Sequence, residues 1–543
     1  MAHEWSLPAV LDVVTGAVPD REMLVWTSVR RTFAEVQDRT RRLAAFFYDH
    51  GLGVQRDRGE LERWECGQSR VAILLSNGPE YVETMIGAWR ARAVPYNVNH
   101  HYNAREVAAL LRQIGTDAVV YHRRLAPLFA DAQLDGRLLV HVDDGSDSAP
   151  LPGSIPYEDA MVRPAGVTAL PTPSPDDLYL VCTGGTTGAP KGVLWRQADI
   201  YVSAMAGIDD ATAEQIGAVA SKGAGVWFAA PPLMHAAAQW TVFSGLHSGA
   251  TVVLHDDAEP FDAGTILETA EREHVTLMTI VGDAYARPIV EELRTGRRDL
   301  SSLEVLGTGG AFTSASLKHD LLEHLPQLTV RDGYGSSETG GMAFGTSRTG
   351  DERREFAPSA GATVLSADRT RFLEPGDDEV GWTARTGRIP LGYLDDREAT
   401  EGTFPIVDGQ RVSVPGDRAT LAADGTITIL GRDSMVVNTG GEKVFVEEVE
   451  EVIRRHPDVI DALVVGRPSE RFGEEVVALV ELRPGALLTP HDVREFAARS
   501  VARFKAPRAV LFCHRIGRHP SGKADYTWAR RAAVDAVDAA QPR

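Results

Sequence analysis

The chain has 543 residues, 43% of them hydrophobic and 24% charged, and its formal net charge is -20 at pH 7. This length exceeds what one hydrophobic core usually supports, so we expect two or more domains. The acidic balance argues against nucleic acids and anionic membranes as partners, because both bind to basic surfaces.

The N-terminus and the cysteines point to the cytoplasm. The first residues, MAHEWSLPAVLDVV, carry acidic residues and a proline where a secretory signal would need a basic and then an apolar region. The three cysteines, Cys66, Cys182 and Cys513, show no spacing typical of zinc sites or disulfide frameworks. No apolar run approaches the roughly 18 residues of a membrane span. We therefore predict a cytoplasmic protein without a transmembrane segment.

The first part of the chain alternates helix and strand patterns. Residues 32–52 place apolar side chains at helical spacing and end near a glycine, which predicts an amphipathic helix. Residues 69–99 predict a strand, a helix and a second strand, after a polar surface insertion at residues 53–68. Similar patterns recur at residues 117–141, 178–181, 226–229 and 275–280. This order is typical of an α/β fold with largely parallel sheets.

The pattern changes near residue 417. Residues 416–434 predict a short hairpin with an Asp-Gly turn. Residues 442–482 then predict a helix, a strand, a loop and a strand, which make a compact α+β unit. We therefore predict an N-terminal domain of residues 1–432 and a C-terminal domain of residues 433–543, the latter of ordinary domain size.

The segment TGGTTGAPKGV, residues 183–193, has the composition of an anion-binding loop. Glycines let several backbone N–H groups approach an anion, threonines add hydroxyl donors, and the lysine adds charge, so a polyphosphate is the natural ligand. A Walker loop does not match, because Gly192 follows the lysine where Ser or Thr is required. An ordinary Gly/Thr-rich connection is the alternative. The predicted phosphate contacts are Thr183, Gly184, Gly185, Thr186, Thr187, Gly188 and Lys191.

This segment resembles the phosphate-binding signature of the adenylate-forming superfamily, which includes acyl-CoA synthetases, luciferases and peptide-synthetase adenylation domains. The family pattern is Tyr-Thr-Ser-Gly-Thr-Thr-Gly-x-Pro-Lys-Gly, and this chain has Cys182 for the Tyr and Gly184 for the Ser. Other family motifs follow in order over nearly the whole chain. The resemblance implies an α/β fold, with a large N-terminal domain of mixed and parallel sheets and a small, mobile C-terminal α+β domain.

The resemblance also implies roles for residues of the N-terminal domain. His235, which ends the motif PPLMH, would line the carboxylate pocket, although a histidine in such a context is by itself more often structural. In RDGYGSSETG, residues 331–340, Asp332 would bind the adenine amino group and Tyr334 would stack on the base. Ser337 would lie near the phosphate and Glu338 would bind Mg²⁺.

The remaining nucleotide contacts come from glycine-rich turns and from the predicted hairpin. The motif GTGGA resembles the turn that lies against the adenine and the acyl group, and VPGDRATL resembles the family segment whose aspartate binds the ribose hydroxyls. The residues assigned in this way are Gly309, Gly310, Ala311 and, for the ribose, Asp417. Gly333 of RDGYGSSETG and Arg432 of the hinge motif GRDSMVVNTGGEKVFVEEVE are also assigned to the nucleotide.

The C-terminal motifs imply two poses of the small domain. Lys523, in HPSGKADY, would bridge the carboxylate and the α-phosphate during adenylation. The domain would then turn about a hinge at Asp433 or Ser434 and present the segment NTGGEK to the thiol of coenzyme A. The residues of that segment assigned to the thiol step are Gly440, Gly441, Glu442 and Lys443.

The lysines of the chain support this interpretation. Only six of the 56 basic residues are lysines, and four of these six fall inside the motifs: Lys191, Lys443, Lys505 and Lys523. Because the chain uses arginine for most positive charges, lysines at these positions indicate a need for the compact ammonium charge on a flexible side chain, which a planar guanidinium does not provide.

Together the motifs imply an ATP-dependent acyl-CoA ligase that uses ATP, Mg²⁺ and coenzyme A and forms an acyl-AMP intermediate. The segments TGGTTGAPKGVLWRQ, YNVNHHYNAREV and NTGGEKVFVEEVE look most like actinobacterial ligases of medium-chain, long-chain or steroid side-chain acids. The alternatives are an acyl-AMP ligase that loads a carrier protein and a non-catalytic nucleotide-binding regulator. Intact Lys523 and Glu338 argue against the regulator. We further expect that the enzyme is not part of a larger multidomain synthetase, and that a homodimer is one possible oligomeric state.

Overall fold

The structure is a computed structural model that describes residues 3–162, 169–183, 190–223, 225–258, 261–296, 298–311, 313–349, 351–352, 356–432, 435–439, 442–469, 473–519 and 522–538. Several predicted site residues lie outside these ranges: Gly184, Gly185, Thr186, Thr187, Gly188, Asp433, Ser434, Gly440 and Gly441.

A five-stranded parallel sheet comes from the first part of the chain, in the order β4-β3-β5-β6-β7. The central strands are buried and rich in Val, Ala and Ile, as expected of a parallel sheet that is covered on both faces. The predicted strand, helix and strand of residues 69–99 are confirmed as β3, α3 (Pro79–Arg90) and β4. The strands are β3 Arg70–Leu74, β4 Val94–Asn97, β5 Ala118–His122, β6 Leu138–Val142 and β7 Ile155–Pro156.

A ten-stranded sheet follows the order β16-β15-β14-β13-β12-β10-β11-β1-β2, with β17 paired to β15. The six central strands pair in parallel, in the order β14-β13-β12-β10-β11-β1. At one edge β2 pairs antiparallel with β1, and at the other edge β15 pairs antiparallel with β14, β16 and β17. The strands are β1 Glu22–Trp26, β2 Val29–Thr32, β10 Val226–Ala229, β11 Thr251–Leu254, β12 Leu277–Ile280, β13 Val305–Gly309, β14 Thr329–Ser336, β15 Gly340–Arg348, β16 Asp351–Glu352 and β17 Ala357–Pro358.

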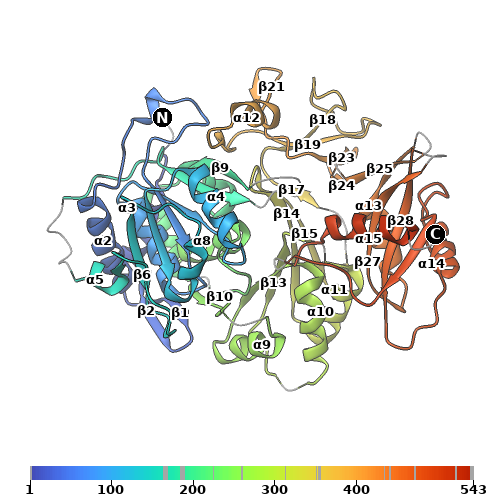
Figure 1. The fold of residues 1–543 in the computed structure, drawn as a ribbon, viewed down its shortest axis with the longest axis horizontal. Helices are drawn as coiled ribbons and strands as arrows, with labels where there is room; N and C mark the ends of the chain where they lie inside the picture. The colour runs from blue at the N-terminus through green and yellow to red at the C-terminus, as the bar shows by residue number, and fades with distance from the viewer. Residues whose placement is uncertain are drawn as a thin grey trace.

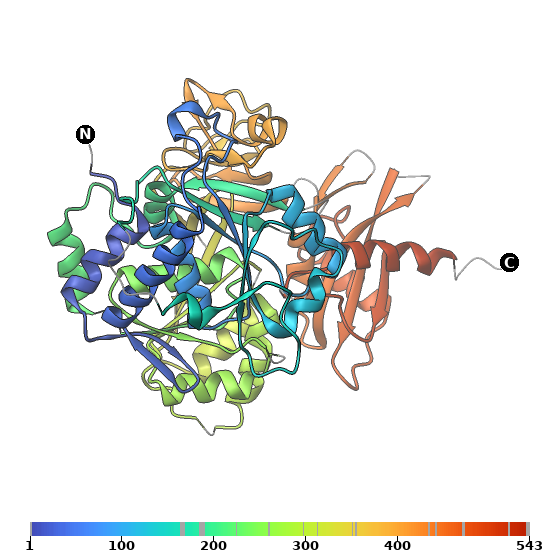
Figure 2. The same cartoon turned by 60° about the vertical axis from the view of Figure 1, so that its left-hand side comes forward.

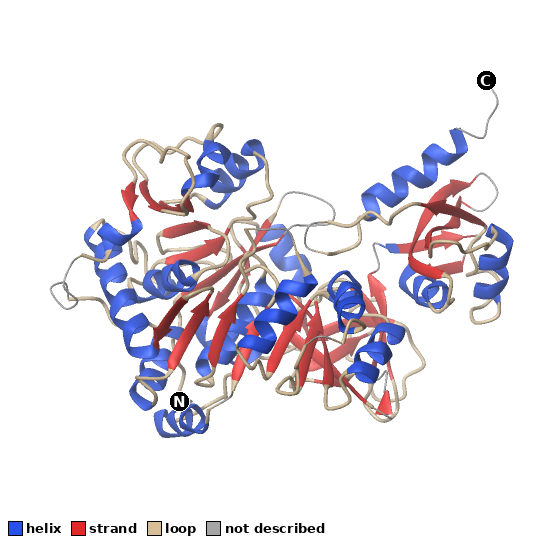
Figure 3. Ribbon diagram, turned by 90° about the horizontal axis from the view of Figure 1, so that it is seen from below, coloured by secondary structure: helices blue, strands red, loops and turns tan. Residues whose placement is uncertain are grey.

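Helices cover both faces of these two sheets (Figure 3). Helices α1, α2, α3 and α8 share one hydrophobic core with strands of both sheets, so they form the layer between them. Helix α4 covers the other face of the five-stranded sheet, and α9, α10 and α11 cover the other face of the ten-stranded sheet. The helices of this part are α1 Leu7–Ala17, α2 Phe33–Asp49, η1 Arg58–Glu60, α4 Ala104–Ile114, η2 Arg123–Phe129, α5 Tyr157–Ala160, α6 Gln197–Ala204, α7 Ala213–Lys222, α8 Ala236–His247, α9 Ala263–Arg272, α10 Gly282–Leu293 and α11 Ala315–His324.

The helix predicted over residues 32–52 is confirmed as α2. It begins at a capping box, in which the Thr32 side chain accepts from the Glu35 backbone and the Glu35 side chain accepts from the Thr32 backbone. Two backbone donors that a helix start leaves free are thereby satisfied. The amphipathic pattern buries the face that carries Val36, Leu43 and Phe47.

Smaller sheets follow and carry several site residues. The predicted hairpin is confirmed as β23 and β24, joined by a turn in which Gly425 has a φ of +85°. The three-stranded sheet has the order β20-β9-β8 and the four-stranded sheet the order β18-β19-β23-β24. The elements are β8 Leu178–Thr183, β9 Lys191–Arg196, β18 Ala362–Leu365, β19 Gly381–Arg385, β20 Gly392–Tyr393, α12 Arg397–Thr403, β21 Ile406–Val407, β22 Gln410–Arg411, β23 Asp417–Leu421 and β24 Ile427–Arg432.

The C-terminal part forms a sheet of its own, in the order β26-β25-β28-β27 with β29 beside β28. It lies at one side of the molecule in both views (Figures 1 and 2). It contacts β24 of the hairpin, and Arg287 of α10 donates to the Ile460 carbonyl. The elements are β25 Val436–Thr439, β26 Glu442–Phe445, α13 Val446–Arg454, β27 Val459–Ser469, β28 Gly473–Leu482, α14 Pro490–Ala498, β29 Ala509–Cys513 and α15 Tyr526–Asp538.

The predicted fold class, an α/β protein with a small C-terminal α+β unit, is confirmed by these sheets. The exact domain boundary at residue 432 stays a prediction. Within the described ranges, no helix combines the length and the apolar character that crossing a membrane would require.

Candidate active site

Two of the predicted nucleotide motifs meet at the ends of neighbouring parallel strands. Strands β13 and β14 pair so that Thr308 lies beside Asp332 and Gly309 lies beside Gly333. A side chain at Gly309 would bring a Cβ to 2.9 Å from the Gly333 carbonyl oxygen, so the close approach requires glycine. Ligands of α/β proteins bind outside the carboxyl ends of such strands, which is where these motifs lie.

Asp332, predicted to bind the adenine amino group, is held by a lysine that the motifs did not include. Lys318 of α11 donates from Nζ to Asp332 Oδ2 at 2.7 Å, and both side chains are mostly buried. Burial raises the pKa of Asp332, and the adjacent Lys318 ammonium opposes this shift. The ion pair therefore fixes the Asp332 carboxylate near the carboxyl ends of β13 and β14.

Asp417, Tyr334 and Arg432, predicted to contact the ribose, the base and the nucleotide, form one network. The Tyr334 hydroxyl donates to Asp417 Oδ2 at 2.5 Å, and Arg432 Nε lies 3.3 Å from Asp417 Oδ1. Asp417 and Arg432 are direct partners across the β23/β24 hairpin, which explains why their side chains meet. Burial and the Asp417 charge raise the pKa of Tyr334, so its hydroxyl stays protonated and donates.

Glu338 and Lys191 meet at a tyrosine that sequence reasoning missed. The Tyr393 hydroxyl donates to Glu338 Oε1 at 3.0 Å, and Lys191 Nζ lies 4.8 Å from the centre of the Tyr393 ring. Lys191 Nζ is also 3.4 Å from Asp396 Oδ2. Tyr393 reaches this place because β20 pairs with β9, the strand that begins at Lys191. No local sequence pattern marks it, since only that pairing brings it to the site.

The backbone around Glu338 is anchored by three buried or half-buried side chains. Trp195 Nε1 donates to the Ser337 carbonyl at 2.9 Å, and Ser413 Oγ donates to the Glu338 carbonyl at 2.6 Å. Arg385 Nη1 donates to the Thr339 carbonyl at 2.6 Å. Burial lowers the pKa of Arg385 to about 10, which still leaves it charged at pH 7. The loop thus holds Glu338 in a fixed position.

His235 lies directly before α8 and is kept neutral. Its burial lowers the pKa to about 4, and the nearby Lys523 and His100 add to this effect. Its Nε2 atom is buried without a hydrogen-bond partner among the described residues. A neutral imidazole with a free ring nitrogen is suited to a hydrogen bond with a carboxyl group or its ester.

Lys523 comes from the C-terminal part of the chain and reaches the same place. The residue is exposed to solvent, yet protein surrounds its ammonium group closely enough for burial to lower its pKa. The positive Arg432 lowers this pKa further, and the negative Glu338 raises it. Lys523 is therefore brought together with Arg432, Glu338 and His235, although they lie 91 to 288 positions earlier in the chain.

The residues predicted to serve the thiol step are only partly described. Lys443 and Glu442 begin β26 and pair with Asn438 and Thr439 of β25. This hairpin carries the segment NTGGEK, whose two glycines lie outside the described residues.

Comparison with known proteins identifies the family. The family model of the AMP-binding enzyme matches residues 12–387, and the model of the AMP-binding enzyme C-terminal domain matches residues 448–523. The chain belongs to the AMP-binding enzyme family.

Relatives of this AMP-binding enzyme are CoA ligases by name. The chain is 43% identical to the medium-chain acyl-CoA ligase Mig of Mycobacterium avium, over 98% of each chain. It is 37% identical to a 3-oxocholest-4-en-26-oate–CoA ligase of Rhodococcus rhodochrous, over 96% of this chain and 95% of the relative. The predicted enzyme class, an acid–thiol ligase, is confirmed by these relatives.

Solved structures show the same fold. The anthranilate CoA ligase AuaEII, in complex with anthranoyl-AMP, superimposes with a TM-score of 0.83 at 19% identity and covers 99% of each chain. A benzoate CoA ligase from Burkholderia xenovorans superimposes with a TM-score of 0.79 at 20% identity, over 97% of this chain and 99% of that one. The predicted adenylate-forming fold is thereby confirmed.

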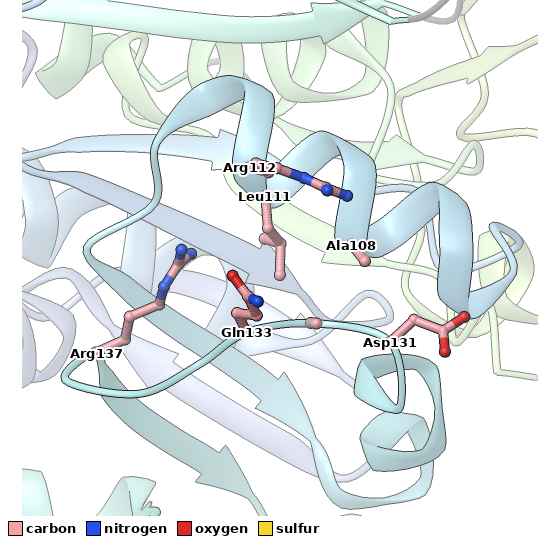
Figure 4. Close-up of a pocket in the computed structure, with 7 residues that line it drawn as sticks. Ala108, Leu111, Arg112, Asp131, Gln133 and Arg137 are labelled. Carbon is pink, nitrogen blue, oxygen red and sulfur yellow. The ribbon is translucent and has the colours of Figure 1, made fainter.

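A surface pocket of this enzyme lies away from the site. It is lined by α4 and by the segment before β6, and Gln133 and Arg137 point toward the helix (Figure 4). None of the site residues assigned above lines it. The convergence of charges at Glu338, and not this pocket, is therefore the candidate active site.

Proposed function

We propose that this enzyme is an ATP-dependent acyl-CoA ligase for medium-chain, long-chain or steroid side-chain carboxylic acids. It would join the acid to AMP, release pyrophosphate, and then transfer the acyl group from AMP to the thiol of coenzyme A. The substrate range is drawn from the names of relatives that are 37–43% identical over nearly the whole chain.

The convergence of Lys523, Arg432 and Glu338 is the observation that supports the proposal most directly. Two cations and a carboxylate from two parts of the chain meet where the nucleotide motifs end. The two cations repel each other; Asp417 and Glu338 offset part of this repulsion, and bound anions between the cations would offset more of it. The α-phosphate of ATP and the carboxylate of the acid supply such anions.

In the first step a carboxylate oxygen forms a bond to the α-phosphorus, and the bond from that phosphorus to the pyrophosphate oxygen breaks. Negative charge gathers on the phosphoryl oxygens and on the departing pyrophosphate. Lys523 would stabilise charge between the acid and the α-phosphate, and Lys191 would hold the β- and γ-phosphates. Asp417 would accept from the ribose hydroxyls and so fix the position of the nucleotide.

The residues present fit a magnesium ion. Among the described residues, the Glu338 carboxylate accepts one hydrogen bond, from Tyr393, so it keeps acceptor sites for a cation. One carboxylate with phosphate oxygens and water is a typical Mg²⁺ environment, and the bound ion would neutralise phosphate charge. Within the described residues, no group of three or more His, Cys, Asp or Glu could hold a metal ion. We therefore assign the protein's share of Mg²⁺ binding to Glu338.

In the second step the thiol sulfur attacks the acyl carbon, loses its proton, and displaces AMP. We propose that the C-terminal domain turns about Asp433 or Ser434, so that Lys523 leaves and the segment with Gly440, Gly441, Glu442 and Lys443 faces the site. Coenzyme A is favoured over a carrier protein because the relatives carry CoA in their names.

The test is release of pyrophosphate and AMP by the purified full-length chain, with and without CoA, over a panel of fatty and steroid side-chain acids. We expect AMP release and acyl-CoA formation that require CoA for at least one acid. AMP release that requires a carrier protein would favour the acyl-AMP ligase instead, and nucleotide binding without turnover would favour the regulator.

The proposal also covers the cellular location and the oligomeric state of the enzyme. We propose that it works in the cytoplasm, where ATP and CoA are supplied, and that it forms a homodimer. Sedimentation of the purified chain tests the second point, and a mass of one chain, 58.8 kDa, would contradict it.

A further inference from the structure

Four polar side chains beside the candidate active site follow the carboxyl ends of parallel strands. Asn77 follows β3, His100 follows β4, His235 follows β10 and Asp257 follows β11. The first two strands belong to the five-stranded sheet and the other two to the ten-stranded sheet. Ligands of α/β proteins bind at such ends, so the position is that of a ligand site.

Contacts join these side chains into one cluster. The Asn77 backbone N–H donates to Asp257 Oδ1 at 2.6 Å, and Asn77 Oδ1 accepts from the Leu233 backbone at 2.7 Å. His100 Nε2 lies 3.9 Å from Asp257 Oδ2, which is too far for a hydrogen bond. Leu233 is two residues before His235, so the cluster adjoins the predicted carboxylate pocket.

Each of these side chains has a buried polar atom without a hydrogen-bond partner among the described residues. The side chains of Asp257 and His100 are only 7% and 8% exposed. Leaving one such atom unpaired costs about 1–3 kcal/mol. Four together indicate a polar ligand. The atoms are Asn77 Nδ2, His100 Nδ1, His235 Nε2 and Asp257 Oδ2.

The charges of the cluster restrict the chemistry of that ligand. Burial raises the pKa of Asp257 to about 6 and lowers the pKa of His100 to about 4, so a carboxylate faces a neutral imidazole at pH 7. The carboxylate requires a donor, whereas the Asn77 amide requires an acceptor. A ketone would leave Asp257 unpaired, and an ammonium would leave the amide unpaired. A hydroxyl both donates and accepts.

We propose that Asn77, His100 and Asp257 form a subsite for a hydroxyl group of the acyl substrate, so that the enzyme prefers hydroxy acids. The hydroxyl donates to Asp257 Oδ2 and accepts from Asn77 Nδ2 or from His100. The inference rests on the proposed function and adds the chemistry of the acid to it.

The test begins with matched acids and the purified full-length enzyme, supplied with ATP, Mg²⁺ and CoA. Octanoic, dodecanoic and hexadecanoic acids are compared with derivatives that carry one hydroxyl or one oxo group, moved along the chain. For at least one position, kcat/KM should be about tenfold or more higher for the hydroxy acid than for both the plain acid and the oxo acid.

Variants then test whether the preference for hydroxy acids depends on these side chains. Asp257→Leu and His100→Phe should each lower the ratio of hydroxy acid to plain acid about tenfold, because each removes a partner of the hydroxyl. Asp257→Asn keeps the acceptor for the Asn77 backbone and should lower the ratio less, which covers the case that Asp257→Leu fails to fold. Asp256→Asn is the matched control, since this neighbouring carboxylate accepts from the Ala258 backbone at 3.1 Å. The control should leave the ratio unchanged.

The outcomes separate the inference from the proposed function. If no acid supports CoA-dependent AMP release, the proposed function itself is wrong. If plain acids are activated but no hydroxy acid is preferred, or if the ratio survives Asp257→Asn and His100→Phe in folded variants, the unpaired atoms bind only water and this inference is overturned.

Discussion

At the scale of single residues, Tyr393 links Lys191 to Glu338, the residues proposed to bind phosphate and Mg²⁺. Its ring lies under Lys191 and its hydroxyl donates to Glu338. A cation over an aromatic ring at an exposed site is worth about 0.5–1 kcal/mol, and a hydrogen bond to a carboxylate about 1.5–3 kcal/mol. Three side chains that are distant in sequence therefore keep one geometry.

Tyr393→Phe removes the hydrogen bond to Glu338 but keeps the ring under Lys191. We expect acyl-AMP formation to slow about tenfold, because Glu338 loses the group that orients it. Single-turnover pyrophosphate release measures this rate, and the thermal midpoint checks the fold. A rate equal to that of the wild type would show that the hydroxyl has no role.

Glu338→Gln keeps the shape of the side chain but removes its charge. We expect the Mg²⁺ concentration for half-maximal adenylation to rise about tenfold or more, since a neutral amide binds Mg²⁺ less tightly. Glu401→Gln is the control, because Glu401 pairs with Arg397 on the surface. An unchanged magnesium requirement would contradict the assignment of Glu338.

At the scale of elements, α10 of the N-terminal part contacts the C-terminal sheet. Arg287 Nη2 donates to the Ile460 carbonyl at 2.6 Å. A Cβ on Gly522, the residue before Lys523, would lie 3.0 Å from Ala284 Cβ. Next to Ile460, Asp461 pairs with Arg518, whose Nη1 donates to the Gly522 carbonyl at 3.0 Å. One helix face thus supports the loop that carries the lysine.

Arg287→Ala removes this support while leaving the catalytic groups in place. We expect acyl-AMP formation to slow about tenfold, and thioester formation from supplied acyl-AMP to change less than about twofold. Arg294→Ala on the same helix is the control, since Arg294 pairs with Asp320 at the surface. Equal losses in both steps would mean that Arg287 only stabilises the fold.

The junction of β24 and α13 contains a buried acid. Glu447 lies against Gly431, and burial, with Glu450 and Asp417 nearby, raises its pKa from 4.5 to about 8. The folded state therefore binds this proton more tightly than the unfolded state, so the free energy of unfolding falls as pH rises from about 4.5 to about 8. The slope of this loss is at most about 1.4 kcal/mol per pH unit.

Glu447→Gln should remove this pH dependence. We expect the variant to match the wild type in thermal midpoint near pH 4, where Glu447 is protonated in both states, and to exceed it near pH 8.5. Glu448→Gln serves as the control, because Glu448 forms an ion pair with Lys505 at 2.7 Å and should show no gain at high pH. A constant difference between Glu447→Gln and the wild type across this range would refute the raised pKa.

At the scale of the whole molecule, elements were easier to predict from the sequence than contacts. The helix of residues 32–52 and the hairpin near Asp417 were predicted because periodicity and turn residues are local signals. Lys318, Arg385 and Tyr393 were missed because only strand pairing and helix packing bring them to the site. The roles of the motif residues were inferred by resemblance and stay predictions.

The proposed mechanism requires that the C-terminal part deliver Lys523 to the nucleotide for the first step only. The most direct measurement is therefore the two half-reactions of Lys523→Ala, followed separately. Pyrophosphate release from ATP and acid should fall by about 100-fold or more, because the charge on the α-phosphate is no longer stabilised. Formation of acyl-CoA from supplied acyl-AMP should stay within about twofold of the wild type. Equal losses in the two half-reactions, or none in the first, would show that Lys523 does not act in the adenylation step alone.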